Sequence, residues 1–125
     1  MAASHYNLDN LIMILDYNKL QITGANNDVM NSEPIAEKFR SFGWAVKEVD
    51  GHNIAELKDT FHQMPIVKGK PSLVIAHTIK GKGVSFMENA VNWHHKVPDK
   101  EQYALAQKEL DEKILALSTT ETKEL

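Results

Sequence analysis

The chain has 125 residues, a formal net charge of −3 and no cysteine. This length fits one small domain, the charge provides no basic surface for nucleic acid, and the lack of cysteine excludes disulfides and thiolate metal sites. No apolar run approaches the roughly 20 residues that span a bilayer, and the first residues do not resemble a secretory signal. We therefore expect a cytoplasmic protein that contacts neither nucleic acid nor a membrane.

The first part of the chain has the pattern of a strand, a loop and a helix. Residues 11–15 form a continuous apolar run between polar residues, which is typical of a strand buried on both faces in a parallel sheet. Turn-forming residues over 23–31 predict a loop. The hydroxyl of Ser32 and the ring of Pro34 predict the start of a helix, and Gly43 predicts its end. Its apolar face would carry Ile35, Ala36, Phe39 and Phe42.

A second strand and helix follow the same order. Residues 44–49 have the composition of a strand, and Asn53 stands where it could cap a helix over 54–64. The apolar positions of that helix recur at helical spacing and predict one buried stripe. These positions are Ile54, Leu57, Phe61 and Met64.

The third repeat of the pattern begins with another apolar run. Residues 72–79 predict a buried strand, and the glycine-punctuated segment 80–98 predicts an irregular loop. Asp99 is expected to cap a final helix that ends near residue 117. The polar tail, 118–125, is expected to fray.

Alternation of strands and helices predicts an α/β fold with parallel strands and right-handed crossovers. Three strands make only a small sheet, and one of its edges would be long and apolar unless another chain or segment covers it. We therefore expect a partial doubly wound parallel sheet of about three strands with flanking helices, in which residues 1–117 form half of a larger domain.

Several polar residues follow the strands at the sheet edge where ligands bind in open α/β folds. Asp16 and Asn18 offer oxygen ligands of the kind that magnesium or calcium prefers. The segment 80–83, Lys-Gly-Lys-Gly, combines positive charge with close backbone approach and favours an anion. The imidazoles of His77, His94 and His95 belong to the same edge. The residues alone equally fit turn formers, an exposed loop and a solvated histidine pair.

Several motifs, taken together in their order and spacing, resemble transketolase. The resemblance is greatest to the separately encoded amino-terminal subunit found in many prokaryotes, and it runs over residues 1–110. It indicates the carboxyl-terminal half of the thiamine diphosphate-binding domain. The motifs are residues 8–24, containing Asp16-Tyr17-Asn18, then Phe42-Gly43-Trp44, Val49-Asp50-Gly51-His52, Gly69-Lys70-Pro71, residues 77–89, containing Lys80-Gly81-Lys82-Gly83, and Trp93-His94.

The resemblance implies thiamine diphosphate and Mg²⁺, or another divalent cation such as Ca²⁺, as cofactors. It implies that Asn18 contributes its side-chain oxygen and Leu20 its backbone carbonyl to the metal. Ile79 would line the thiazolium and diphosphate region, and Lys82 would contact the cofactor. His94 would reach the diphosphate and the substrate, as a cofactor-binding and catalytic residue that can transfer a proton.

The sequence departs from the family pattern in two places. The Gly-Asp-Gly half of the metal motif is absent from this chain, and His95 stands where the subunit family has glycine. If that glycine has a positive φ, a histidine there costs on the order of 1 kcal/mol. The expected partners are the amino-terminal half of the domain and the pyrimidine-binding subunit, which holds the family's activating glutamate, in an oligomer.

The implied function is that of a fragment or split subunit of a transketolase-like enzyme, inactive as an isolated chain. The complete enzyme would transfer a two-carbon ketol unit between sugar phosphates. One alternative is a fragment of 1-deoxyxylulose-5-phosphate synthase, although residues 85–89 and Trp93-His94 favour transketolase. Others are a non-catalytic remnant or interaction module, and a flavodoxin-like nucleotide-binding domain, whose glycine-rich first turn is lacking.

Overall fold

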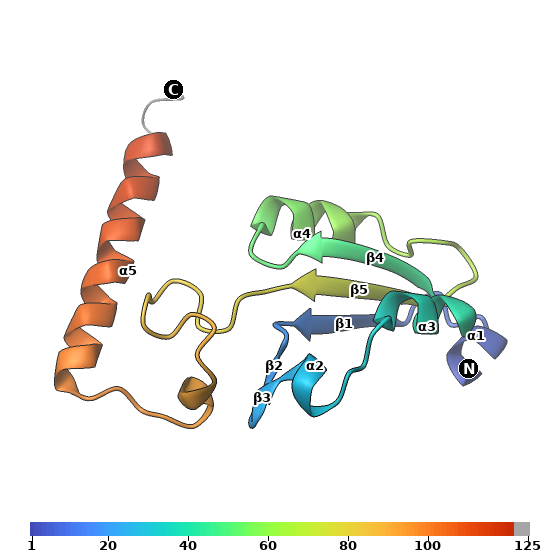
Figure 1. The fold of residues 1–125 in the computed structure, drawn as a ribbon. Helices are drawn as coiled ribbons and strands as arrows, with labels where there is room; N and C mark the ends of the chain where they lie inside the picture. The colour runs from blue at the N-terminus through green and yellow to red at the C-terminus, as the bar shows by residue number, and fades with distance from the viewer. Residues whose placement is uncertain (122–125) are drawn as a thin grey trace. The chain divides into compact units, whose positions relative to one another are not determined.

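The computed structural model describes residues 1–121, and these form two compact units (Figure 1). The first unit comprises residues 1–19 and 24–78, and the second comprises residues 20–23 and the chain from Ile79 onward. Length alone had indicated one small domain and did not reveal this subdivision. No helix of the described residues is long and apolar enough to cross a membrane.

A three-stranded parallel sheet forms the centre of the first unit. Its strands are β1 (Ile12–Tyr17), β4 (Ala45–Asp50) and β5 (Ser72–His77), in the order β1-β5-β4. The most apolar strand, β5, is central, and Leu73 and Val74 are completely buried. Full burial of such a side chain contributes roughly 1.5–3 kcal/mol, so β5 anchors the sheet. The expected parallel α/β architecture is confirmed.

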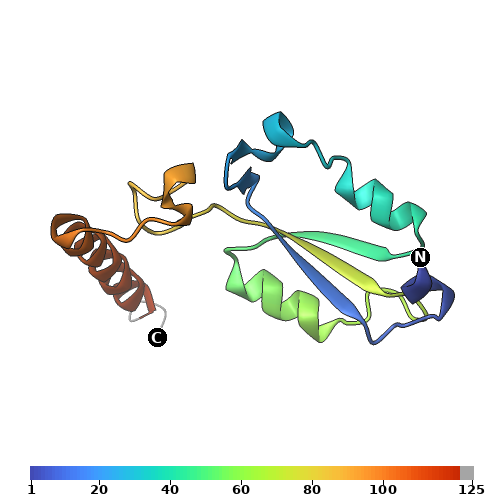
Figure 2. The same cartoon turned by 90° about the horizontal axis from the view of Figure 1, so that it is seen from below.

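Helices cover opposite faces of this sheet (Figure 2). On one face, Leu73 and Ile75 contact Ala36 of α3 (Ile35–Ser41). On the other, Val74 and Ala76 form a cluster against which Leu57 of α4 (Ile54–His62) packs. Successive side chains of a strand point to opposite faces, so one apolar strand supplies two cores. This is the doubly wound arrangement that the apolar runs predicted.

The edge strand β1 departs from its predicted burial. Its run of apolar side chains predicts a strand buried on both faces, but Ile12, Met13 and Ile14 are 40, 38 and 57 % exposed. The reason is that β1 has a neighbour, β5, on one side only. An apolar groove beside α3, lined in part by Met13, Leu15 and Phe39, continues this surface. The expected long apolar edge is therefore present.

The start of α3 also differs from the prediction. Ser32 does not cap the helix through its hydroxyl; Glu33 accepts a hydrogen bond from the backbone N–H of Ile35 at 2.9 Å. Its longer side chain reaches the helix start from two residues upstream. Phe42, expected on the buried face, is about half exposed, because it lies beyond the last helical turn. Gly43, with φ +87°, ends the helix as expected.

The predicted loop over 23–31 contains short regular elements. These are β3 (Gly24–Ala25) and α2 (Asn26–Val29), preceded by β2 (Leu20–Gln21); α1 (Ala2–His5) lies at the beginning of the chain. Such two- and four-residue elements are too short for periodicity to reveal them. By contrast, the predicted cap of α4 is confirmed, because Asn53 Oδ1 accepts from the N–H of Glu56 at 3.1 Å.

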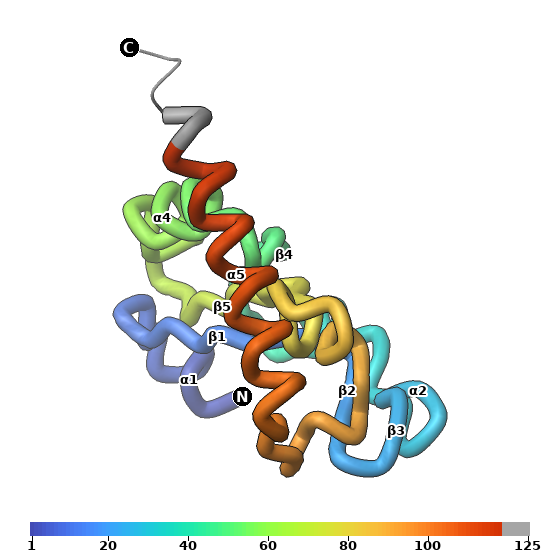
Figure 3. Tube along the Cα trace, turned by 90° about the vertical axis from the view of Figure 1, so that its left-hand side faces the viewer, coloured from blue at the N-terminus to red at the C-terminus, as the bar shows by residue number. Residues whose placement is uncertain are grey.

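The second unit contains the irregular segment after β5, a 3₁₀ turn η1 (Val91–His94) and the long helix α5 (Lys100–Glu121), which Figure 3 traces as one continuous helix. Asp99 Oδ1 accepts from the N–H groups of Glu101 and Gln102 at 3.0 and 2.9 Å, which confirms the predicted cap. The helix continues past residue 117 to Glu121. The rest of the expected tail, 122–125, lies outside the described residues.

Candidate functional site

The carboxyl end of β1 is joined to the exit of β5 within the first unit. Thr78 donates its hydroxyl proton to Asp16 Oδ1, and its backbone N–H donates to the carbonyl of Tyr17 at 3.3 Å. These bonds extend the parallel pairing of the two strands beyond His77. Asp16, predicted as an oxygen donor of the strand edge, is thus engaged by a neighbouring strand, and Asn18 follows directly on this braced segment.

Gly51 brings the turn after β4 against the same strand exit. Its N–H donates to the carbonyl of His77 at 2.8 Å. A Cβ atom at Gly51 would lie 2.4 Å from Cγ2 of Thr78, a separation that real Cβ atoms do not show. The glycine of the Val49-Asp50-Gly51-His52 motif is therefore needed for close approach between two strand ends.

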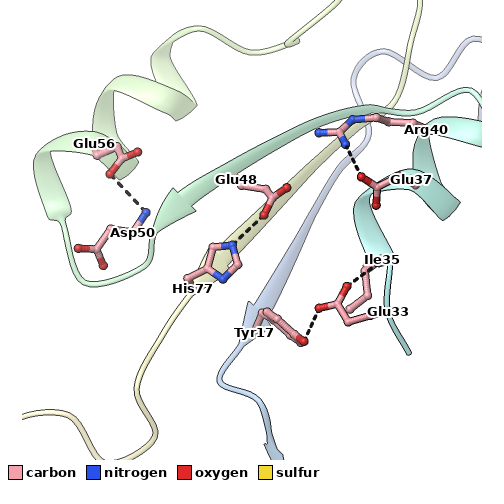
Figure 4. A network of polar contacts seen from close by, with 9 residues as sticks. All are labelled: Tyr17, Glu33, Ile35, Glu37, Arg40, Glu48, Asp50, Glu56 and His77. Atoms are coloured by element: carbon pink, nitrogen blue, oxygen red, sulfur yellow. Dashed lines mark hydrogen bonds and ion pairs between the residues drawn. The ribbon is translucent and has the colours of Figure 1, made fainter. Parts of the chain in front are cut away.

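Tyr17 and Glu33 join β1 to the start of α3 (Figure 4). The Tyr17 hydroxyl donates to Glu33 Oε1, while Glu33 Oε2 holds the N–H of Ile35. The hydrogen bond to Glu33, with burial and the carboxylate charge, raises the pKa of Tyr17 to about 12. The bonds from Tyr17 and Ile35 lower the pKa of Glu33.

The two pKa shifts define where this contact contributes stability. A lowered carboxyl pKa contributes above the ordinary glutamate pKa and is lost as the pH falls through the lowered value. The raised pKa of Tyr17 contributes below the ordinary tyrosine pKa and is lost as the pH rises through about 12. The contact between Tyr17 and Glu33 therefore persists throughout the neutral range and fixes the residue that lies between Asp16 and Asn18.

His77 belongs to this same network rather than to the other candidate histidines. Its Nε2 lies 2.9 Å from Glu48 Oε2 on β4, and its ring meets that of Tyr17 edge to face, with centroids 5.7 Å apart (Figure 4). His94 and His95 belong to the second unit. The sequence did not reveal the roles of Glu33 and Glu48, since pairs separated by 16 and 29 residues leave no periodic signal.

The glycine-containing loop of the second unit is tightly closed. Gly81 has φ +73°, and a Cβ there would lie 2.4 Å from the carbonyl oxygen of Met87. The N–H of Gly83 donates to Glu88 Oε1 at 3.0 Å, and Lys82 Nζ lies 3.8 Å from the same oxygen. The loop is thus a defined structure in which Lys82 is paired with an acid of its own segment.

His94 lies beside a lysine of that loop. Its Nδ1 is 3.4 Å from Lys80 Nζ. Although the side chain is largely exposed, partial desolvation, followed by the positive charges of His95 and Lys80, lowers the pKa of His94. A neutral ring with its proton on Nε2 accepts from Lys80, and a neutral imidazole can also take up a proton. This corner therefore combines a cation with a base.

The backbone at His95 does not have the positive φ considered from the sequence; φ is −127°, which any residue adopts. We therefore expect His95→Gly to bring no stabilisation and to lower the free energy of unfolding by about 0.5–1 kcal/mol, because glycine has more freedom in the unfolded chain. It also removes the edge-to-face contact with His94, whose ring centroid lies 4.4 Å away.

Denaturant unfolding monitored by Trp93 fluorescence tests this expectation. His62→Gly is unsuitable as a control because His62 is helical; His95→Ala is the matched variant, which removes the ring without adding backbone freedom. A variant His95→Gly that unfolds at a higher denaturant concentration than wild type would show that this position requires a positive φ.

The structure divides the predicted site residues between the two units. Asn18 belongs to the first, whereas Leu20, Ile79, Lys82 and His94 belong to the second. Among the described residues, no three histidine, aspartate or glutamate side chains gather as a metal site would require. The metal ligands implied for this chain, Asn18 and Leu20, would supply neutral oxygens only.

A family model describing the thiamine diphosphate binding domain of transketolase matches residues 1–113. The chain belongs to the transketolase family. Because the match includes both strand ends and the loop after β5, it assigns the elements described above to a thiamine diphosphate-binding domain. It also supports the predicted relation to the amino-terminal subunit of a transketolase.

Curated relatives are transketolase subunits of bacteria. The chain is 45 % identical over 114 residues to the A subunit of the apulose-4-phosphate transketolase of Phocaeicola vulgatus, covering 91 % of this chain and 41 % of that protein. It is 40 % identical over 111 residues to the SqwG subunit of the 6-deoxy-6-sulfo-D-fructose transketolase of a Clostridium species, covering 89 % and 40 %. The chain thus spans about two fifths of these relatives.

Solved transketolases share the fold. The crystal structure of transketolase from Campylobacter jejuni superposes with a TM-score of 0.80 at 28 % identity, covering 88 % of this chain and 17 % of that one. Transketolase from Leishmania mexicana gives a TM-score of 0.67 at 21 % identity, covering 97 % and 21 %. The second likeness shows the fold alone.

The donor chemistry of this transketolase chain fits the anionic part of thiamine diphosphate. Lys80, Lys82 and His94 bring positive charge and a proton-binding ring to one unit, and the loop between them has defined glycine turns. Donors of this kind suit a diphosphate. The metal part is less complete, since Asn18 and Leu20 carry no negative charge.

Proposed function

We propose that this chain is one part of a split transketolase that transfers a two-carbon ketol unit between sugar phosphates. The observation that carries the proposal is the combination of family and extent. The chain matches the thiamine diphosphate binding domain over residues 1–113 but spans about two fifths of the corresponding subunits of its bacterial relatives. A cytoplasmic location is part of the proposal.

In this proposal the chain supplies half of the cofactor site, the carboxyl-terminal half of the binding domain. Asn18 gives its side-chain oxygen and Leu20 its carbonyl to Mg²⁺ or Ca²⁺, which in turn neutralises the cofactor diphosphate. The hydrogen bonds of Asp16 and Tyr17 support Asn18, because they fix the strand that precedes it. Ile79 lines the thiazolium region, and Lys82 contacts the diphosphate.

His94 is the proposed catalytic residue. Bound thiamine diphosphate supplies the carbanion chemistry, and the protein supplies position and electrostatics. Its lowered pKa keeps His94 neutral near pH 7, so the ring can accept a proton from a sugar hydroxyl and return it. Lys80, at 3.4 Å, orients the ring and provides positive charge for a phosphate or diphosphate oxygen.

The remaining parts of the site must come from elsewhere in the assembly. Relatives that are named as one subunit of a transketolase imply a second one, and these relatives are longer than this chain. The exposed apolar edge β1 supports a neighbouring segment at that position. We propose that the amino-terminal half of the domain and a pyrimidine-binding subunit complete the site, in an oligomer, whether or not the half-domain belongs to the same polypeptide.

A complementation assay tests the function. This chain, joined to or mixed with the amino-terminal half of the domain and the pyrimidine-binding subunit of a bacterial relative, should catalyse ketol transfer between sugar phosphates. His94→Ala should lower kcat by about 10²–10⁴, the usual contribution of a positioned proton-transfer group. His52→Ala, in the exposed turn after β4, is the matched control and should leave kcat unchanged.

Other outcomes of this assay contradict the proposal. Formation of 1-deoxyxylulose 5-phosphate in place of ketol transfer would assign the chain to that synthase. A folded, cofactor-loaded complex without either activity would indicate a non-catalytic module. Equal kcat in wild type and His94→Ala would remove His94 from the chemistry.

A further inference from the structure

One carboxylate of α5 holds the loop that follows β5. Glu109 Oε2 accepts from the backbone N–H of Ser85 at 2.7 Å, and Glu109 Oε1 accepts from the hydroxyl of the same residue. Both oxygens of one side chain therefore hold a residue that lies 24 positions away in the sequence. Such two-point contacts fix orientation as well as distance.

A second side chain of the same helix holds the loop two residues earlier. Lys113 Nζ donates to the carbonyl of Gly83. Residues four apart lie on one face of a helix, so Glu109 and Lys113 reach the loop side by side. Leu110 contacts the same point, since a Cβ at Gly83 would lie 3.3 Å from Leu110 Cδ2.

The contact depends on charge. The two hydrogen bonds from Ser85 lower the pKa of Glu109, and the charge of Lys113 adds to them. The other charged groups of the held segment are Lys82 and Glu88, which pair with each other at 3.8 Å. A lowered carboxyl pKa means that the contact is complete above the ordinary glutamate pKa and is lost as the pH falls through the lowered value.

The held segment is the one that carries a proposed cofactor contact. Glu88 closes it from within through the N–H of Gly83, and Glu109 and Lys113 hold Ser85 and Gly83 from outside. A loop without regular structure loses much conformational entropy when it orders on a ligand. Contacts that order it beforehand reduce that loss.

We propose that Glu109 and Lys113 are positioning residues that order the loop of residues 80–88 for binding the cofactor diphosphate. This inference rests on the proposed function for its ligand, whereas its structural part, the ordering of the loop by α5, does not. Neither residue touches the reacting atoms; both act through Gly83 and Ser85.

Hydrogen exchange of the full chain, measured by mass spectrometry on peptides covering residues 80–90, tests the ordering. Glu109→Gln keeps the shape of the side chain but loses its charge, and we expect exchange of this peptide to quicken at least about fivefold at pH 7. Glu112→Gln is the matched control, because this carboxylate lies on the same helix and pairs with Lys108 at 3.9 Å. Its exchange should equal that of wild type.

The pH profile separates a charge-dependent contact from a general loss of stability. After correction for intrinsic exchange, wild-type protection of the 80–90 peptide should fall between pH 7 and about pH 4, whereas Glu109→Gln should show little further change. Peptides covering β5 report on the rest of the fold and should be unchanged. If β5 also exchanges faster, Lys113→Met is the second variant, which breaks only the contact to Gly83.

The outcomes for the loop and for the cofactor are distinct. Unchanged exchange of the 80–90 peptide in both Glu109→Gln and Lys113→Met would overturn the inference, whatever the protein binds. Faster exchange, together with at least tenfold weaker binding of thiamine diphosphate and Mg²⁺ by the complemented complex, would support both parts. Faster exchange with unchanged binding would overturn the role in cofactor binding, and a wild-type complex that does not bind the cofactor would overturn the proposed function alone.

Discussion

The isolated chain should not bind thiamine diphosphate with Mg²⁺ at micromolar concentrations. Mg²⁺ requires about six oxygen ligands in a near-octahedral array and gives up its water reluctantly. This chain offers two implied ligands, Asn18 and Leu20, both neutral, and no cluster of three acidic or histidine side chains occurs within residues 1–121. Isothermal titration of the purified chain with cofactor and Mg²⁺ is the direct measurement.

Supplying the amino-terminal half of the domain and the pyrimidine-binding subunit should restore binding. In that complex, Asn18→Ala should weaken cofactor binding at least tenfold, about 1.4 kcal/mol, because a metal ligand is lost. Asn27→Ala, an exposed asparagine of α2, is the matched control and should bind as wild type does. Micromolar, magnesium-dependent binding by the chain alone would contradict the view that its site is incomplete.

The purified chain should also associate with itself. The strand β1 is an edge strand, and its side chains at Ile12, Met13 and Ile14 are 38–57 % exposed. An apolar strand edge with unpaired backbone groups favours pairing with another chain. Analytical ultracentrifugation should show dimers or larger species at tens of micromolar, and a compact monomer with a sharp two-state melt would contradict this expectation.

A matched pair of variants identifies the surface responsible. Ile14→Lys places a charge on β1, where Ile14 is 57 % exposed, and should shift the chain toward monomer. Ile114→Lys makes the same change on α5, where Ile114 is 64 % exposed, and should leave the association unchanged. The opposite result would locate the association on α5 instead of β1. The amino-terminal half of the domain should abolish it, because this segment is expected to cover the edge.

The sequence by itself determined the order of strands and helices, their parallel pairing and the family. The apolar runs around Met13, Val46 and Val74 and the caps at Asn53 and Asp99 are local signals, because periodicity and capping depend on neighbouring residues. The motif residues Asn18, Lys82 and His94 were found by resemblance, and their roles stay predictions. The carboxyl-terminal half of the domain, as the identity of this chain, also stays a prediction.

The tertiary structure decided what depends on residues far apart in the chain. The exposure of Ile14 follows from the edge position of β1, which no local pattern encodes. Glu33 displaced Ser32 as the partner of the α3 start because Tyr17, 16 residues earlier, fixes its carboxylate. The backbone at His95 and the contact of Glu109 with Ser85 were likewise undetermined, because a φ angle and a hydrogen bond across 24 residues depend on how the segments fold together.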